Sequence, residues 1–213
     1  GGLALLFRSC SPSIIYEAAT QLQLFLKSLS PEAIPLFLEN YESHLRSIFE
    51  SSLPLLQAFF DSSPAVVYDH RWTQHSVRGA IMDLTRCIIE TFEDLNLVSE
   101  LLQLIPIDGA ESNSFNPIVR ILINVLSEPN EKLRQNISQD AFNCTIFLLS
   151  SLNKYLSQVQ NNICKLLIKL IPLLDLDDDN VLDQFFNQLL SMFIDNRPIA
   201  FDPFTNYFNQ FTN

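Results

Sequence analysis

The stretch that decides the fold reads Leu126-Ser-Glu-Pro-Asn-Glu-Lys-Leu-Arg134. An aliphatic residue closes one predicted helix, a Pro-Asn turn follows, and a Leu-Arg pair lies one turn into the next helix. Proline suits the first turn of a helix and disrupts its interior. The segment therefore predicts a joint between two consecutive helices, the second continuing through Ala141.

Similar helix starts recur along the chain. Ser11-Pro12, Ser30-Pro31 and Asn116-Pro117 each place a capping residue before a proline. Apolar residues then recur at spacings of three and four, which predicts buried helix faces. The residues expected on these faces are Ile15, Ala18, Ala19, Leu22, Phe25 and Leu26; Leu36, Phe37, Tyr41, Leu45, Ile48 and Phe49; and, in a helix over about 70–95, Val77, Ile81, Leu84, Ile88 and Phe92.

The whole chain, residues 1–213, is predicted to be all-α. Only four glycines occur, too few for the turns of a strand-rich fold. Gly79 within a helix suggests a close helix crossing. Residues 106–117 are expected to form a loop dividing two sub-stacks. Further helices, for a total of about ten or eleven, are expected over 53–60, 98–105 (stopped by Pro106), 117–126, 131–156, 158–174, 180–194 and 203–211.

Charge and hydropathy exclude several classes of function. The net charge is −11, so the surface would repel a phosphate backbone, and we expect no nucleic-acid binding. Basic protein segments would be attracted instead. Hydrophobic residues make up 47% of the chain, yet no apolar run approaches the ~18 residues of a membrane span. We therefore expect no membrane insertion.

No catalytic or metal-binding pattern is present in the sequence. It lacks a glycine-rich phosphate loop, a nucleophile elbow and a His-Glu-x-x-His helix. The histidines do not combine with the cysteines at metal-ligand spacing, and we expect the cysteines to be buried free thiols. We expect no enzyme activity, catalytic residue, metal or cofactor. The residues considered are His44, His70 and His75 with Cys10, Cys87, Cys144 and Cys164.

The chain is expected to be intracellular, in the cytoplasm, the nucleus or both. The first seven residues lack the charged leader and small-residue cleavage site of a signal peptide. Two glycosylation sequons begin at Asn136 and Asn143, but both fall within a predicted helix, where the acceptor would be poorly presented. Apolar segments at both ends of the chain suggest that it is a fragment of a longer protein.

The segment from Leu126 to Ala141 resembles the HEAT-repeat consensus of a leucine, an acidic-Pro-Asn turn, a Leu-Arg pair and a small residue. The segment Val77-Arg78-Gly79-Ala80 resembles the same consensus less closely. The resemblance implies a right-handed α-α superhelix of the HEAT/armadillo type, that is, an α-solenoid. It also implies that Leu133 and Val77 enter the interhelix core. Arg134 and Arg78 would then pair with acids of adjoining repeats.

Within that family, the acidic balance and the segment Ser30–Glu42 are similar to importin-β-type nuclear transport receptors. The resemblance implies a non-catalytic protein-binding scaffold whose partners are other proteins, such as basic peptide segments or a small GTPase. Two alternatives stay open. One is the helical arm of a large enzyme, such as a giant kinase or ubiquitin ligase. The other is a vesicle-coat trunk, which Ile15–Ala19 resembles over five residues.

The acidic run Asp175-Leu-Asp-Asp-Asp179 is the most pronounced surface feature of the sequence. Acids at the start of a helix complement the positive end of its dipole, by a few tenths to about 1 kcal/mol. A second interpretation is a patch for a basic partner, with Asp175, Asp177, Asp178 and Asp179 as the binding residues.

Overall fold

The computed structural model describes most of residues 11–61, 74–127 and 131–194, and isolated residues before them. The described residues are 5, 7, 11–61, 74–92, 96–108, 115–127, 131–155, 157–175 and 178–194. Every regular element among them is a helix, which confirms the all-α class. No helix within these ranges has the length and apolar content needed to cross a bilayer. The chain divides into two compact units, Gly1–Leu95 and Asn96–Asn213.

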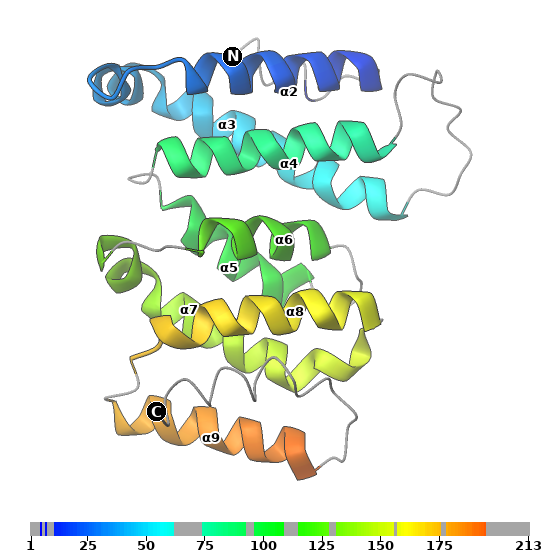
Figure 1. Ribbon diagram of the computed structural model, residues 1–213, viewed down its shortest axis with the longest axis vertical. Coiled ribbons are helices and arrows are strands. Elements are labelled where there is room, and N and C mark those ends of the chain that lie inside the picture. Colours follow the sequence, from blue (N-terminus) through cyan, green and yellow to red (C-terminus); the bar gives the residue numbers. More distant parts are fainter. Residues whose placement is uncertain are drawn as a thin grey trace. The chain divides into compact units, whose positions relative to one another are not determined.

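The first unit contains α2 (Pro12–Lys27), α3 (Ala33–Asp61) and α4 (Gln74–Thr91). Helix α4 packs against both α2 and α3 (Figure 1). Helix α2 starts at Pro12, as the Ser-Pro pair predicted. All five expected core positions of the long helix are buried, including Phe92 just beyond its end. The predicted close crossing at Gly79 is wrong, because a Cβ built there would meet no atom within 4 Å.

Helix α3 corrects the prediction of a separate helix over 53–60. It runs without interruption from Ala33 to Asp61 and contains Pro54. Its buried face continues in helical register across the proline, which itself is exposed. Packing of this continuous face offsets the hydrogen bond that Pro54 cannot donate. The buried residues of this face are Leu45, Ile48, Phe49, Ser52 and Leu56.

The second unit is a series of helices in which alternate members pack together. Helix α5 (Leu97–Asp108) packs on α7 (Glu131–Ser151), and α6 (Asn116–Val125) packs on α8 (Ser157–Leu170). Helix α7 also packs on α9 (Asp179–Ile194), while the pairs α5–α6 and α7–α8 contact each other directly (Figure 1). Each inner helix therefore contacts both its sequence neighbour and the helix two places away.

The proline near the end of α5 acts differently from the prediction. Pro106 lies inside α5 and does not stop it, because Leu101, Leu102 and Ile105 anchor the helix in the core. Of the expected loop 106–117, residues 109–114 lie outside the described part, and α6 already begins at Asn116.

After α7 and α8 the chain tightens into short 3₁₀ turns, η2 (Leu152–Lys154) and η3 (Ile171–Leu173). The predicted helix over 203–211 lies outside the described residues.

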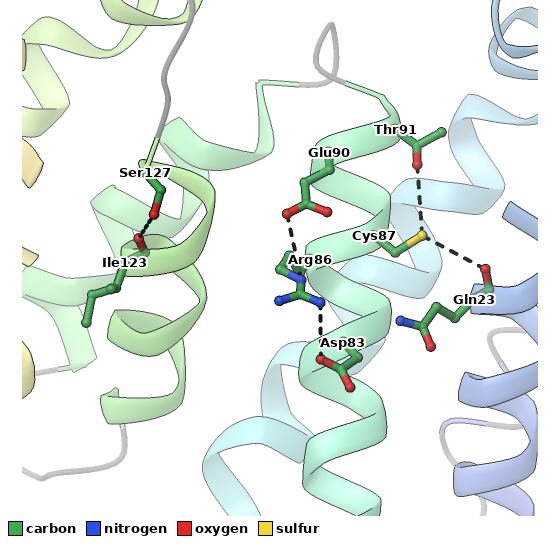
Figure 2. Close-up of polar contacts among 8 residues, drawn as sticks. All are labelled: Gln23, Asp83, Arg86, Cys87, Glu90, Thr91, Ile123 and Ser127. Atoms are coloured by element: carbon green, nitrogen blue, oxygen red, sulfur yellow. Dashed lines mark hydrogen bonds and ion pairs between the residues drawn. The ribbon is translucent and has the colours of Figure 1, made fainter. Parts of the chain in front are cut away.

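Buried hydroxyls are satisfied within their own helices. Ser52 donates to the Ile48 carbonyl at 2.8 Å, and Thr145 donates to the Ala141 carbonyl at 2.7 Å. Thr85 and Ser151 do the same to the carbonyls four residues earlier, at 2.8 Å each. At the end of α6, exposed Ser127 donates to the Ile123 carbonyl at 2.9 Å (Figure 2). Such bonds remove the cost of burying a hydroxyl without linking one helix to another.

Side-chain hydrogen bonds also link alternate helices in the second unit. Asp140 of α7 accepts hydrogen bonds from Ser99 Oγ at 2.5 Å and from Gln103 Nε2 at 3.1 Å, both on α5. Asn162 of α8 donates its amide to Asn116 Oδ1 of α6 at 2.9 Å. These contacts join the same pairs of alternate helices that the apolar core joins.

Candidate interaction surface

An aromatic cluster lies where the end of α2 meets the start of α3 and the end of α4. It consists of Phe25, Phe37, Tyr41 and Phe92. The Phe37 ring stacks on Tyr41 at a centroid distance of 4.8 Å and on Phe92 at 5.9 Å, and it meets Phe25 at 5.6 Å. Phe92 is fully buried and forms the base of the cluster. Ring pairs at these separations are favourable beyond their buried area.

The outer side of this cluster is exposed to solvent. Phe25 is 47% exposed and Tyr41 is 48% exposed, and the neighbouring Leu36 is 63% exposed. Helical spacing places Leu36 about 100° around α3 from Phe37 and about 140° from Tyr41, so it points away from the ring stack. Contiguous exposed apolar side chains of this kind are typical of interaction sites. We call Phe25, Phe37 and Tyr41 the aromatic surface, and Leu36 is a separate exposed apolar side chain on α3.

Exposed carboxylates border Leu36, on the side of α3 that points away from the ring stack. Glu39 follows Leu36 by three residues and shares its helical face, whereas Glu32 lies in the turn just before α3, and both are exposed. Hydrogen bonds from the Glu32 backbone and from Ser30 lower the pKa of Glu32. Neither carboxylate joins an ion pair among the described residues. This border is therefore negatively charged at neutral pH.

The nearest cation along the chain, Lys27, points elsewhere. It follows Phe25 by two residues, about 200° around the helix. Its charge acts on Cys87 of α4, where it opposes the rise in the pKa of that thiol. Lys27 therefore does not cover the aromatic surface.

The sequence pattern misassigned these exposed side chains. Phe25, Leu36 and Tyr41 were expected on buried faces and are exposed instead. Their helices carry runs of adjacent apolar residues, Leu24-Phe25-Leu26 and Leu36-Phe37-Leu38, that are wider than one face can bury. That excess width is the signal that could have identified the surface.

The described cysteines are buried free thiols, as predicted. Burial raises the pKa of Cys144, and it raises the pKa of Cys164 to about 11. Burial also raises the pKa of Cys87, whose sulfur lies 4.0 Å from the Gln23 carbonyl and 3.9 Å from the Thr91 hydroxyl (Figure 2). Thiols in this state are poor nucleophiles at neutral pH. Cys10 lies outside the described residues.

Arg86 of α4 lies between two carboxylates of its own helix. Its guanidinium is 3.7 Å from Asp83 Oδ1 and 3.7 Å from Glu90 Oε1 (Figure 2). Its buried Nε–H finds no hydrogen-bond acceptor among the described residues. These separations are ion pairs without hydrogen bonds, and they contribute little to stability.

The acidic run serves at least partly to start α9. The backbone N–H of Asn180 donates to Asp178 Oδ1 at 2.8 Å, the geometry of a helix N-cap. Asp175, Asp178 and Asp179 are exposed, whereas Asp177 lies outside the described residues. The outer face of α9 then carries Phe186 and Leu190, which are 49% and 54% exposed. This face is a second, smaller apolar surface.

The residues of the expected repeat joints are only partly described. Val77 is fully buried, and Arg78 is half-buried and has an interaction partner. Leu133 and Arg134 lie in α7, but their side chains are outside the described part. Leu126 and Ala141, which bracket the quoted segment, are both buried.

Metal ligands do not gather anywhere in the described residues. No group of three or more His, Cys, Asp or Glu side chains lies close enough to hold an ion there. His44 is exposed beside Tyr41, with ring centroids 6.0 Å apart. His70 and the side chain of His75 lie outside the described part. Both sequon asparagines, Asn136 and Asn143, lie within α7, as predicted.

Comparison of the chain with protein-family models, curated proteins and solved structures finds no match. The functional argument therefore depends on the surfaces of this chain alone.

Proposed function

We propose that this chain is a non-catalytic scaffold for protein–protein interaction, built as an α-solenoid of the HEAT/armadillo type. In such folds each helical layer packs only on its neighbours, and one face of every layer stays available to a partner. Leu133, Arg134, Val77 and Arg78 would be the joints between layers in this arrangement.

The packing of alternate helices carries this proposal. Within the second unit α5 packs on α7, α7 on α9, and α6 on α8. In the first unit α4 packs on α2, the helix two places earlier. Stacked helical pairs produce this order of contacts, whereas a compact bundle packs its helices around one shared core.

The exposed side chains support an interaction role. Leu36, Phe25 and Tyr41 on the first unit, and Phe186 and Leu190 on the second, remain in solvent although the cores beneath them are well buried. Asp175, Asp178 and Asp179 add exposed negative charge beside α9. A partner with basic and apolar side chains would complement both surfaces.

Photo-crosslinking from the two units tests this function. Benzoylphenylalanine replaces Leu36 or Phe186 in cells, and Glu50, exposed on α3 away from the aromatic surface, serves as the control position. We expect discrete protein adducts from position 36 or 186 that are absent from position 50. The adducted proteins, once purified, should bind the wild-type chain with a saturable calorimetric isotherm. Absence of adducts above the control would contradict the scaffold role.

A nuclear transport role is the narrower form of the proposal. It predicts that the immobilised chain retains a small GTPase loaded with GTP and releases it in the GDP state. Equal retention of both nucleotide states, or none of either, would exclude transport and leave the general scaffold role intact. Flotation of the chain with anionic vesicles would instead favour a vesicle-coat trunk. A kinase or ligase domain in a longer form of the protein would favour the arm of a large enzyme.

A further inference from the structure

We propose that the outer face of α9 binds a basic amphipathic segment of a partner protein, one with arginine or lysine at one end and apolar side chains at the other. The residues that would contact it are Asp179, Asp183, Phe186 and Leu190, which we call the α9 stripe. This inference depends on the proposed scaffold function, and it specifies the face, the chemistry and the direction of the contact.

Helical spacing brings the four side chains of the α9 stripe onto one face. At about 100° per residue, Asp179, Asp183 and Leu190 all lie within about 60° of Phe186, on the same side of it. Along the helix axis the stripe is about 16 Å long. Its N-terminal half is acidic and its C-terminal half is apolar. Because Asp183 lies only one turn before Phe186, the carboxylates directly border the apolar side chains.

The apolar half of the stripe lies outside the core. Phe185 and Leu189 are the buried residues of α9, at 2% and 5% exposure, whereas Phe186 and Leu190 are 49% and 54% exposed. The buried ring of Phe185 meets the ring of Phe186 edge to face, at a centroid distance of 5.9 Å. This contact holds the exposed ring in position before a partner arrives, so that less side-chain entropy is lost on binding.

The charges of the stripe select the sign of the partner. Asp179 and Asp183 are exposed, and neither joins an ion pair within the described part of the chain. Residues 175–194 include no lysine, arginine or histidine, so no cation of α9 neutralises them. Exposed Asp175 and Asp178 add charge of the same sign, and the net charge of the whole chain is −11. A basic segment is therefore attracted, while an acidic segment or a second copy of this chain is repelled.

The order of residues in the stripe sets the order in the partner. A partner helix must carry its basic residues in one block, against Asp179 and Asp183, and its apolar residues in another, against Phe186 and Leu190. If the two kinds alternated, cations would lie against apolar side chains and lose water without gaining a partner. This block order distinguishes the α9 stripe from general attraction between a basic peptide and an acidic protein.

Random-peptide display on the folded wild-type chain supplies the probe. We expect the enriched peptides to carry arginine or lysine in one block and leucine or aromatic residues in another. Synthetic fluorescein-labelled copies are then titrated by anisotropy against Asp183→Lys and Leu190→Ser. Each substitution should weaken binding by about tenfold or more, the equivalent of about 1.4 kcal/mol. A copy in which glutamate replaces the basic residues should bind Asp183→Lys more tightly than it binds wild type.

Matched substitutions on the first unit act as controls. Glu50→Lys makes the same change of charge at an exposed position of α3, and Leu36→Ser removes an exposed leucine from the same helix. Both should leave the affinity within about twofold of wild type. Circular dichroism of all four variants should match wild type, since every substituted side chain is exposed.

Several results would overturn the inference. Enriched peptides without basic residues, or with the two kinds interleaved, would remove the argument from the stripe. Unchanged affinity in both Asp183→Lys and Leu190→Ser would place binding elsewhere. If position 36 gives crosslinked adducts and position 186 gives none, the scaffold function survives and the α9 stripe does not. Self-association of the wild type that Leu190→Ser abolishes would identify the face as an interface between two copies instead.

Discussion

The side-chain amide of Asn162 donates to the side-chain oxygen Oδ1 of Asn116 at 2.9 Å, and this bond joins α8 to the first residue of α6. Asn116 is almost entirely buried, so its amide oxygen has little access to water. A buried acceptor without a donor costs the desolvation of that group. The pair therefore stabilises the contact between two alternate helices. An apolar residue in place of one asparagine alone would leave the other without its hydrogen-bond partner.

Removal of the donor should destabilise the fold. We expect Asn162→Ala to lower the free energy of unfolding by about 1–3 kcal/mol, because Asn116 would keep an unsatisfied oxygen. Urea denaturation followed by circular dichroism measures this loss. Asn161→Ala is the control, since Asn161 is the exposed neighbour on the same helix. Equal stability of the two variants would contradict a structural role for the bond.

If each helical layer packs only on its neighbours, a destabilising substitution in α9 should affect only the helices next to it. Leu189 is buried on α9, and Leu189→Ala should cost about 2–5 kcal/mol in the layers that it supports. Hydrogen exchange should speed up in α9 and α7, while the amides of α5 and α6 keep most of their protection.

The neighbouring residue supplies the control for that experiment. Leu190 is 54% exposed, so Leu190→Ala should leave every helix protected as in wild type. Uniform loss of protection across α5, α6, α7 and α9 in Leu189→Ala would indicate one shared core, and the solenoid proposal would then fail.

Buried thiols make the fold less stable at alkaline pH. Burial raises the pKa of Cys164 from its usual 9.0 to about 11. Between these values the unfolded chain releases the thiol proton and the folded chain retains it. The unfolded state then binds fewer protons, so the free energy of unfolding decreases as pH rises from about 9 to about 11. Below about pH 9 the effect is absent.

The contribution of Cys164 can be isolated by comparison with Cys164→Ala. Other titrating groups are common to the two proteins and cancel in the difference. We expect the stability advantage of wild type, measured by urea denaturation at pH 8 and pH 10.5, to shrink at the higher pH. A difference that is independent of pH would show that the thiol is solvated in the folded chain.

Substitution of Arg86 should not lower the free energy of unfolding. Its buried Nε–H has no acceptor among the described residues, and its two ion pairs are 3.7 Å long. Arg86→Met keeps the aliphatic stem and removes the unsatisfied donor, so stability should stay the same or rise by up to about 1 kcal/mol. Arg46→Met is the comparison, because Arg46 bonds Glu42 at 3.2 Å. A larger loss in Arg86→Met than in Arg46→Met, by thermal denaturation, would contradict this account.

Local signals in the sequence predicted where most helices begin and which residues of α4 are buried. Pro12, Asn116 and the spacing from Val77 to Phe92 depend on short-range geometry, which one sequence contains. Pro54 and Pro106 were misread because tertiary packing of their helices outweighs the missing hydrogen bond. Periodicity alone does not predict the exposure of Leu36 and Tyr41, since it identifies an apolar face but not the element that covers it, and only the width of the apolar run Leu36-Phe37-Leu38 indicates an uncovered side chain.

The hydroxyls of Ser52, Thr85, Thr145 and Ser151 each bond a carbonyl of their own helix. Together with Asn116 they are the buried polar side chains of the described residues. At these four positions a small change in the angle between packed helices breaks no hydrogen bond. A change in the angle between packed helices is therefore resisted at these four positions by packing alone, whereas in the second unit it would also strain the bonds of Asp140 and Asn162 between helices.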